Sequence, residues 1–315
     1  MNTILVSGAE GFIGKPLCKM LSDKGNSVIA LVFNKKLFGH DFKQQKNIKI
    51  VEADITKKLF WKKIGKSFDF CVHLAGISDA NHAEKNPKLA YAVNVTGTKN
   101  ILLACKKLHA KGIILASSNK GYGKIKNKNI DENCKLSGKS VYARTKILAE
   151  KQVLGFCKKN KISAIVARQT NVYGPSDKNI ARLIPATIVS ILKNQEPNVT
   201  CDASQTINLI YVDDMLDFYL KAIKYLEKNN GQEIINATNS EDKTVKEVIN
   251  KIKTSMGKTK SDKSAKPNAK SKFSNKKAEF LLAWKPKTGF EQGIKATIKW
   301  YKKHYGDICT KQINI

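Results

Sequence analysis

The sequence predicts an α/β fold built on a doubly wound parallel sheet, and two observations predict it. First, short apolar runs alternate along the first half of the chain with segments whose apolar residues recur at helical spacing. Second, these runs are nearly continuous, as in strands that are covered on both faces of a parallel sheet. The runs expected to form strands are 3–6, 28–33, 48–51, 68–74, 113–117 and 163–167.

The first expected helix follows the first strand directly. Ile13, Leu17, Met20 and Leu21 mark its apolar face, and Gly25 ends it. Two more helices are expected in the first half, over 86–108 and 141–159. Beyond residue 175 the pattern is looser, with strands expected over 207–212 and 233–236 and helices over 182–192, 213–225, 245–256 and 290–304.

The chain is strongly basic, with a formal net charge of +31, yet only 3 of its 57 basic residues are arginine. Proteins that read base sequence depend heavily on arginine forks, so we expect no specific nucleic-acid partner. The lysines are spread over the whole chain, which favours a composition that solvates the surface and attracts polyanionic substrates.

Composition also excludes several classes of protein. With 315 residues and 42% hydrophobic residues, the chain has enough apolar material for one large domain or two modest ones. No apolar run approaches the roughly 20 residues that span a bilayer, and a glycine turn follows the N-terminus at once. We therefore expect a cytoplasmic protein without a membrane partner. The chain has seven cysteines, which are scattered along the sequence, and none is part of a C-x-x-C pair. We therefore expect no disulfide framework and no metal site.

The glycine turn Gly8-Ala9-Glu10-Gly11-Phe12-Ile13-Gly14 lies between a buried strand and a helix. In that context Gly8 permits the tight turn, Gly11 lets the backbone approach phosphates, and Gly14 allows close packing of helix and strand. The helix N-terminus then faces the negative charge. The turn predicts a binding site for the pyrophosphate of a dinucleotide.

The choice between NAD and NADP is expected at the end of the second strand, where an acidic residue accepts from the ribose 2′-hydroxyl of NAD. This strand ends in Asn34, Lys35 and Lys36, with no acidic residue. The lysines suit the 2′-phosphate of NADP, so the cofactor is predicted as NAD or NADP without a decision. Asp54, after the third strand, is placed to meet the adenine end.

Tyr142 and Lys146 lie one turn apart at the start of an expected helix, where they share a face. A tyrosine hydroxyl titrates near pH 10, too high for proton exchange at neutral pH. The ammonium group of Lys146, together with a cationic nicotinamide, would favour the phenolate. Ser118 ends the fifth strand at the carboxyl edge of the sheet, where its hydroxyl can hold the substrate oxygen that gains or loses the proton.

With these elements in place, the chain resembles the extended short-chain dehydrogenase/reductases, the NAD-dependent epimerase/dehydratase family, and in particular the nucleotide-sugar enzymes. The likeness runs from near Ile4 to near Tyr305. Besides the glycine turn and the Tyr142–Lys146 segment, it rests on His73–Gly76, Asn94–Thr98, Ser117–Ser118, Tyr122–Gly123, Asn171–Pro175, Tyr211–Asp214 and Leu282–Pro286.

The resemblance implies a Rossmann domain at 1–172, to which 207–236 returns, and a smaller C-terminal α/β substrate domain at 173–206 and 237–306. The segment 257–272 is rich in lysine and serine with almost no apolar residues, so its composition predicts a mobile surface loop. Ser118, Tyr142 and Lys146 would form the catalytic set, Asn94 would help position the lysine, and Asn171 would touch the substrate's diphosphate. Asn119 joins the substrate site. The cofactor site would comprise Gly8, Gly11, Phe12, Ile13, Gly14, Asn34, Lys35, Asp54, Ile55, Leu74, Ala75, Gly76, Asn94, Tyr142 and Lys146.

Two departures from the family pattern narrow the function. The dehydratases usually carry an Asp-Glu pair just after the catalytic serine or threonine, whereas this chain has Asn119 and Lys120. Dehydration is therefore not expected. In the family an arginine that binds the nucleotide's phosphates often precedes the segment that corresponds to Tyr211–Asp214, but here Ile207, Asn208 and Leu209 occupy that region. The sequence therefore leaves the identity of the nucleotide open.

These observations favour a nucleotide-sugar 4-epimerase of the UDP-hexose type, which oxidises the sugar transiently to a 4-keto form. The main alternative is an NADPH-dependent 4-keto-nucleotide-sugar reductase. An alternative of another class is a non-catalytic dinucleotide-sensing module, against which the complete Ser118, Tyr142 and Lys146 set argues. A homodimer paired through two long helices is expected by analogy alone.

Overall fold

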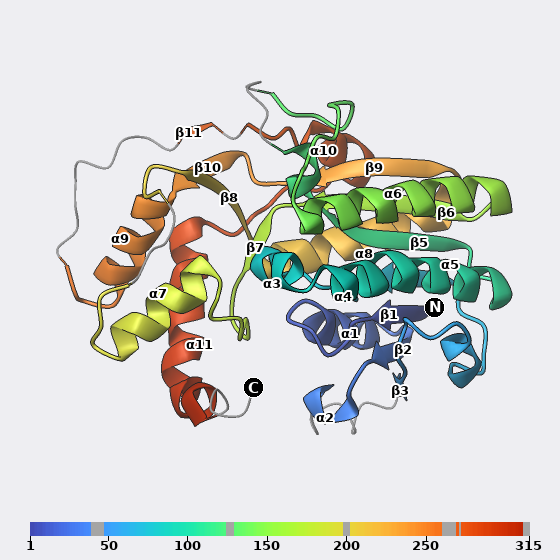
Figure 1. Cartoon of the computed structure of the whole chain (residues 1–315), viewed down its shortest axis with the longest axis horizontal. Coiled ribbons are helices and arrows are strands. Elements are labelled where there is room, and N and C mark those ends of the chain that lie inside the picture. Colours follow the sequence, from blue (N-terminus) through green and yellow to red (C-terminus); the bar gives the residue numbers. More distant parts are fainter. Residues whose placement is uncertain (39–46, 124–128, 198–201, 260–268, 271, 311–315) are drawn as a thin grey trace.

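Seven parallel strands form one sheet in the larger lobe of the molecule (Figure 1). This computed structural model describes residues 1–38, 47–123, 129–197, 202–259, 269–270 and 272–310. The strand order β3-β2-β1-β4-β5-β6-β9 runs outward in both directions from the centre, so the prediction of a doubly wound parallel sheet is confirmed. The strands are β1 (Thr3–Ser7), β2 (Ser27–Val32), β3 (Ile48–Glu52), β4 (Phe70–His73), β5 (Gly112–Ser118), β6 (Ser163–Gln169) and β9 (Gln232–Ala237).

Helices cover both faces of this sheet, which explains why its strands are apolar without interruption. In β1, Ile4 and Val6 pack in one apolar core, whereas Leu5 packs in the core on the opposite face. The face of Ile4 contacts α1 and α8, and the face of Leu5 contacts α5 and α6. These helices are α1 (Gly14–Asp23), α5 (Thr98–Lys107), α6 (Val141–Asn160) and α8 (Val212–Lys228).

The helix predicted over 86–108 is divided into shorter elements. α3 (Ala80–Lys85) ends before Asn86, and α4 (Pro87–Tyr91) begins at Pro87, because proline cannot donate a hydrogen bond to a preceding turn but fits the first turn of a new helix. Next, η3 (Ala92–Gly97) has the wider hydrogen bonding of a π-helix and leads into α5. Such turns are rare and often lie at functional sites. This one carries Asn94.

A second sheet, of four strands in the order β11-β10-β8-β7, belongs to the smaller lobe, together with α7, α9 and α11 (Figure 1). β7 and β8 are parallel, and the other pairs are antiparallel. The elements are β7 (Asn171–Tyr173), β8 (Thr206–Tyr211), β10 (Glu241–Thr244), β11 (Ala269–Lys270), α7 (Leu183–Leu192), α9 (Val245–Ser255) and α11 (Phe290–Thr310). α10 (Lys276–Leu282) packs instead against α8 and β9 of the larger lobe. Short turns of helix are α2 (Lys35–Phe38), η2 (Phe60–Lys63) and η4 (Asn119–Tyr122).

The segment 207–236, expected to return to the larger domain, contributes to both sheets. β8 pairs with β7 and β10 of the smaller sheet, whereas β9 pairs with β6 of the larger one. Asp214 of α8 ties the C-terminal segment to the larger lobe: its side chain accepts from the backbone N–H of Lys287 and Thr288, both at 3.0 Å. Of the expected lysine-rich loop over 257–272, residues 260–268 and 271 lie outside the described residues.

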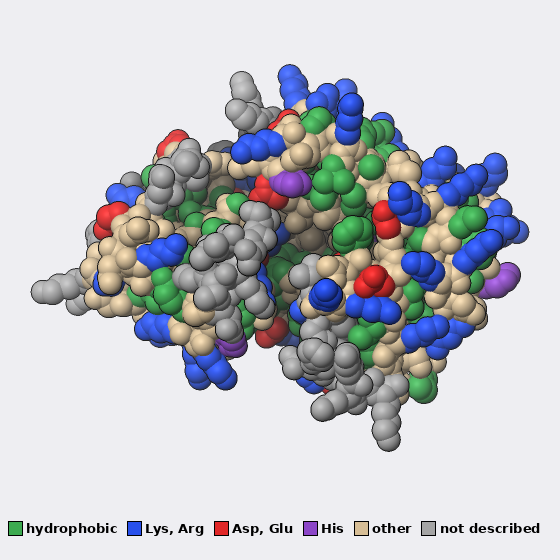
Figure 2. Space-filling view, turned by 60° about the horizontal axis from the view of Figure 1, so that its bottom comes forward, with side chains coloured by type: hydrophobic (Ala, Val, Ile, Leu, Met, Phe, Trp, Pro, Cys, Tyr) green, Lys and Arg blue, Asp and Glu red, His purple; other side chains and the backbone are tan. Residues whose placement is uncertain are grey.

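Lysine and arginine side chains are spread around the face of the molecule in Figure 2 and do not gather in one patch. Within the described ranges, no helix has the length and apolar character needed to cross a membrane. In the same part of the chain, no three His, Cys, Asp or Glu side chains come together as a metal site. The five cysteines that can be described there are free thiols.

Candidate active site

A cavity of about 990 Å³ opens at the carboxyl edge of the larger sheet. Its lining joins the glycine turn and the ends of β2, β4 and β5 to residues of the smaller lobe such as Ile207 and Val245. The surface is visibly hollowed between the two lobes in Figure 2. This is the position at which open α/β sheets bind their ligands, because the strand ends and loops diverge there.

Two glycines of the turn, Gly8 and Gly14, have no room for a side chain. Gly8 adopts a φ of +68°, and a Cβ there would lie 2.7 Å from the backbone N of Ala75. A Cβ at Gly14 would lie 2.2 Å from the backbone O of Gly8. At the next strand end, a Cβ on Gly76 would come within 2.9 Å of Asn94 Oδ1. The bare backbone around the cavity therefore fits the close approach of a dinucleotide's phosphates.

Ser118, Tyr142 and Lys146 come together against this cavity. Tyr142 and Lys146 follow one another on α6, with the Lys146 ammonium 5.9 Å from the centre of the tyrosine ring. Lys146 Nζ donates to the backbone O of Ala116 in β5 at 2.9 Å, which fixes the helix against the strand that ends in Ser118. All three side chains line the cavity and are almost fully buried.

Burial has the largest effect on the pKa values of Lys146 and Tyr142. It lowers the pKa of Lys146 to about 8, while the negative charge of Glu150 acts in the opposite direction. Burial also raises the pKa of Tyr142, whereas its hydrogen bond with Ser118 and the positive charge of Arg182 lower it. Within the protein, desolvation therefore outweighs the nearby hydrogen bond and charge. The expectation that Lys146 together with a cationic nicotinamide favours the phenolate of Tyr142 stays a prediction.

Asn94 lies behind the cavity and braces the same region. Its side chain accepts from the N–H of Ile77 at 2.8 Å and donates to Ile77 O at 3.1 Å and to Thr145 Oγ1 at 3.0 Å. Thr145 precedes Lys146 on α6. Asn94 could therefore position Lys146, as expected, through its hydrogen bond to the adjacent Thr145.

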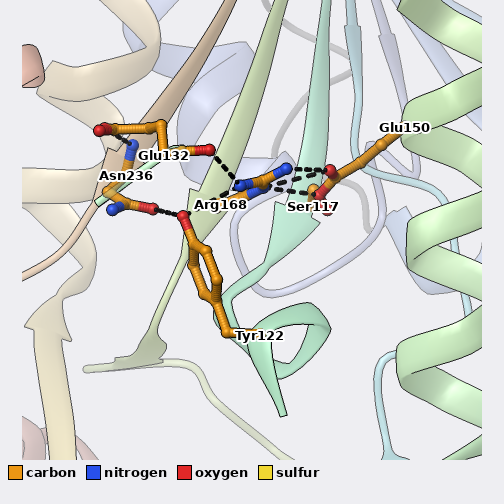
Figure 3. A network of polar contacts seen from close by, with 6 residues as sticks. All are labelled: Ser117, Tyr122, Glu132, Glu150, Arg168 and Asn236. Carbon is orange, nitrogen blue, oxygen red and sulfur yellow. Dashed lines mark hydrogen bonds and ion pairs between the residues drawn. The ribbon is translucent and has the colours of Figure 1, made fainter. Parts of the chain in front are cut away.

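A buried ion pair holds the segment around Ser118 from both sides (Figure 3). Glu150, one turn beyond Lys146 on α6, pairs with Arg168 of β6 at 2.9 Å and accepts a hydrogen bond from Ser117. Arg168 Nη1 in turn donates to Tyr122 Oη at 3.0 Å. Ser118 thus lies between two anchored residues. Sequence reasoning missed this pair, although the spacing from Tyr142 through Lys146 to Glu150 places all three on one helix face.

Arg182 is a second residue that the sequence analysis left without a role. It pairs with the buried Asp177 at 3.1 Å and donates to Ser78 Oγ, across the cavity, at 3.2 Å. Both arginine and aspartate line the cavity. Arg182 is the one cavity-lining arginine among the described residues, and it lies close enough to Tyr142 to influence its pKa.

Most of the predicted site residues lie together. Asn34 and Lys35 do not line the cavity, and Asn94 lies behind it. Asn34 Oδ1 instead accepts from the N–H of Lys36 at 2.9 Å. Those that line the cavity are Gly8, Gly11, Phe12, Ile13, Gly14, Asp54, Ile55, Leu74, Ala75, Gly76, Ser118, Asn119, Tyr142, Lys146 and Asn171.

The fold and the cavity define a dinucleotide-dependent enzyme of the short-chain dehydrogenase type. Residues 4–238 match the model of the NAD dependent epimerase/dehydratase family. The chain belongs to this family.

Similar proteins match this chain over 96% of its length. A putative UDP-glucose 4-epimerase of Methanocaldococcus jannaschii is 30% identical over 309 residues, covering 96% of this chain and 99% of the relative. The solved UDP-glucose 4-epimerase of Thermotoga maritima, with UDP-glucose, superposes with a TM-score of 0.85 at 25% identity, covering 96% and 99%. A UDP-glucuronic acid 4-epimerase mutant of Bacillus cereus, with NAD and a fluorinated substrate analogue, has the same fold, with a TM-score of 0.86 at 23% identity and coverage of 96% and 100%.

Proposed function

We propose that this enzyme is a nucleotide-sugar 4-epimerase that acts on a UDP-hexose. The observation that carries the proposal is that Ser118, Tyr142 and Lys146 line one cavity together with the glycine turn. The relatives described above add support, since the Methanocaldococcus and Thermotoga proteins carry the name of a UDP-glucose 4-epimerase.

The chemistry of the cavity follows from its three side chains. Tyr142 exchanges a proton with the sugar's 4-hydroxyl, and Ser118 holds the same oxygen by a hydrogen bond. We propose that protonated Lys146, 5.9 Å from the centre of the Tyr142 ring, acts together with the charge of Arg182 against the burial that raises the pKa of Tyr142. A nicotinamide dinucleotide held beside the glycine turn of Gly8, Gly11 and Gly14 would supply the hydride-transfer chemistry for the oxidation and reduction of the sugar carbon. Tyr142 is itself almost fully buried, so bulk water has little access to it.

We propose that the two lobes divide the binding. Residues 1–172 would hold the dinucleotide, and 173–206 with 237–306 would hold the nucleotide sugar, because the cavity is lined from both lobes. Asn171 on the cavity wall is the proposed contact to the diphosphate. The helices α5 and α6 pack side by side, and the pairing of two copies of the chain through them stays a prediction. Size-exclusion chromatography would test it by showing the mass of a dimer.

Dehydration is disfavoured by the residues beside Ser118. Elimination of water needs an acid and a base next to the reacting carbons. Asn119 and Lys120 begin η4 at this place, and neither can supply a carboxylate.

The epimerase and the reductase differ in their use of cofactor. Purified protein is incubated with UDP-glucose without added cofactor, and product is followed by NMR of the anomeric proton. An epimerase forms UDP-galactose under these conditions, because it regenerates its cofactor in each turnover. Oxidation of NADPH by a 4-keto-sugar nucleotide, without interconversion of UDP-glucose, would favour the reductase and contradict the proposal.

Tyr142→Phe separates an enzyme from a sensing module. The variant keeps the ring and loses the proton, so we expect epimerisation to fall about 10²- to 10⁴-fold while the dinucleotide still binds. Tyr225→Phe is the matched control, since Tyr225 lies on α8 and does not line the cavity. Unchanged biological activity of Tyr142→Phe would favour the sensor.

A further inference from the structure

Glu10 occupies the middle of the glycine turn, and its side chain reaches the end of β2. One carboxylate oxygen, Oε1, accepts a hydrogen bond from the backbone N–H of Phe33 at 2.7 Å. The turn itself is fixed to β2 by the bond from Ala9 N to Leu31 O, at 3.2 Å. A carboxylate therefore stands at the end of the second strand, although it comes from a different part of the sequence.

The other oxygen of this carboxylate has no donor. Glu10 Oε2 is buried and makes no hydrogen bond to any part of the chain that the structure describes. Glu10 also belongs to the lining of the cavity, beside Gly8 and Gly11. A buried carboxylate oxygen without a donor is unfavourable, so the site is suited to a ligand that brings a hydroxyl group.

The lysines that suggested NADP are less well placed than Glu10 to contact a bound dinucleotide. Lys35 and Lys36 are exposed on α2, and neither lines the cavity. The backbone N–H of Lys35 donates to Glu52 Oε2 at 2.8 Å, and Glu52 does not line the cavity either. Exposed charges are screened by water and salt, whereas a charge in the cavity wall acts with less screening.

We propose that Glu10 takes the part of the missing acidic residue at the end of β2 and makes this enzyme select NAD over NADP. Its carboxylate accepts a hydrogen bond from a hydroxyl of the adenine ribose. The 2′-phosphate of NADP removes that hydroxyl and brings further negative charge next to Glu10. The inference rests on the dinucleotide site of the proposed function, and it does not depend on which sugar is epimerised.

Equilibrium binding tests this inference without turnover. The purified protein is titrated with NAD and with NADP by calorimetry, and nucleotide released from the protein as purified is identified by mass spectrometry. We expect NAD to bind at least about tenfold more tightly than NADP, the size of a partly screened like-charge contact. The released nucleotide should be NAD.

Glu10→Gln removes the charge and keeps an oxygen to accept from Phe33. We expect the ratio of NAD to NADP affinity to fall about tenfold or more, chiefly through tighter NADP binding. Glu52→Gln is the matched control, because Glu52 lies in the same corner but does not line the cavity, and its ratio should equal that of the wild type. Thermal unfolding of each variant checks that it is folded.

Two results would overturn the inference: wild-type protein that binds NADP as tightly as NAD, or a folded Glu10→Gln variant with an unchanged ratio. Epimerisation of UDP-glucose is measured separately on the same samples. An enzyme that epimerises but shows no effect of Glu10 refutes the inference alone. A protein that selects NAD through Glu10 but does not epimerise refutes the proposed function alone.

Discussion

Glu150 and Arg168 form the most deeply buried ion pair among the described residues, with side chains 3% and 4% exposed. Glu150→Gln would leave the Arg168 guanidinium buried without a counter-charge and would replace a charged acceptor for Ser117 with a neutral one. Removing one partner of such a pair costs about 3–5 kcal/mol. Domains are stable by only about 5–15 kcal/mol, so we expect a large loss of stability in urea unfolding.

The same substitution has a second, independent effect on the active site. The negative charge of Glu150 raises the pKa of Lys146, which burial holds at about 8. Without that charge Lys146 loses its proton at lower pH. The fall of kcat on the alkaline side should therefore begin at lower pH in Glu150→Gln than in the wild type. A loss of stability alone would not move this limb, so kcat is measured against pH at a temperature where both proteins are folded.

Asp23→Asn provides the matched control. Asp23 forms an ion pair with Lys19 at 2.8 Å on α1, but both side chains are more than half exposed, at 53% and 57%. Exposed pairs contribute about 0–1 kcal/mol, so this variant should unfold almost like the wild type and keep its pH profile. A Glu150→Gln variant that unfolds like Asp23→Asn and has an unshifted alkaline limb would refute the reasoning.

Three further outcomes are expected. Because the pKa of Lys146 is about 8, kcat should fall above pH 8, and a kcat that climbs through pH 9 would contradict this. Between pH 8 and the ordinary lysine pKa of 10.5, the unfolded chain binds a proton at Lys146 that the folded protein has lost, so the free energy of unfolding should rise with pH over this range. Gly14→Ala should abolish dinucleotide binding, since its Cβ would lie 2.2 Å from Gly8 O, whereas Gly155→Ala on α6 meets nothing within 4 Å and should add about 0.5–1 kcal/mol in urea unfolding. Thr244→Ala removes the capping box with Glu247 on α9 and should lower stability by about 1 kcal/mol; no change would show that the cap is unimportant.

Long periodic segments were predicted well because their signal is local. Apart from 86–108, which is divided into α4, η3 and α5, the strands and helices of the larger sheet lie where the apolar runs place them, as at β6 (Ser163–Gln169) and α6 (Val141–Asn160). Short strands such as β7 (Asn171–Tyr173) and β10 (Glu241–Thr244) were not predicted. Three or four residues carry too little periodicity, and their pairing with β8 is decided by contacts far along the chain.

In the candidate site, too, local motifs predicted some residues, whereas others depend on contacts between distant parts of the chain. Ser118, Tyr142, Lys146 and the glycine turn could be named from motifs, because each motif has a local geometric requirement. Arg182 could not be assigned, since its partners are Asp177 nearby and Ser78, which is 104 positions away in the sequence. The pKa of Tyr142 was also out of reach, because burial of its hydroxyl outweighs the charges that a motif suggests.

The sequence by itself determined the doubly wound sheet and the family, and it named the residues proposed for proton transfer, because these depend on spacing along one strand, turn or helix. It left NAD against NADP undecided, since the strand that should carry an acid ends in Asn34, Lys35 and Lys36. Only the tertiary structure brought Glu10 to that strand end, across 23 positions of sequence, with one oxygen bonded to Phe33 and the other buried. The energy of a charge depends on its distance from other groups and on how deeply it is buried, and both are set only by the folded structure.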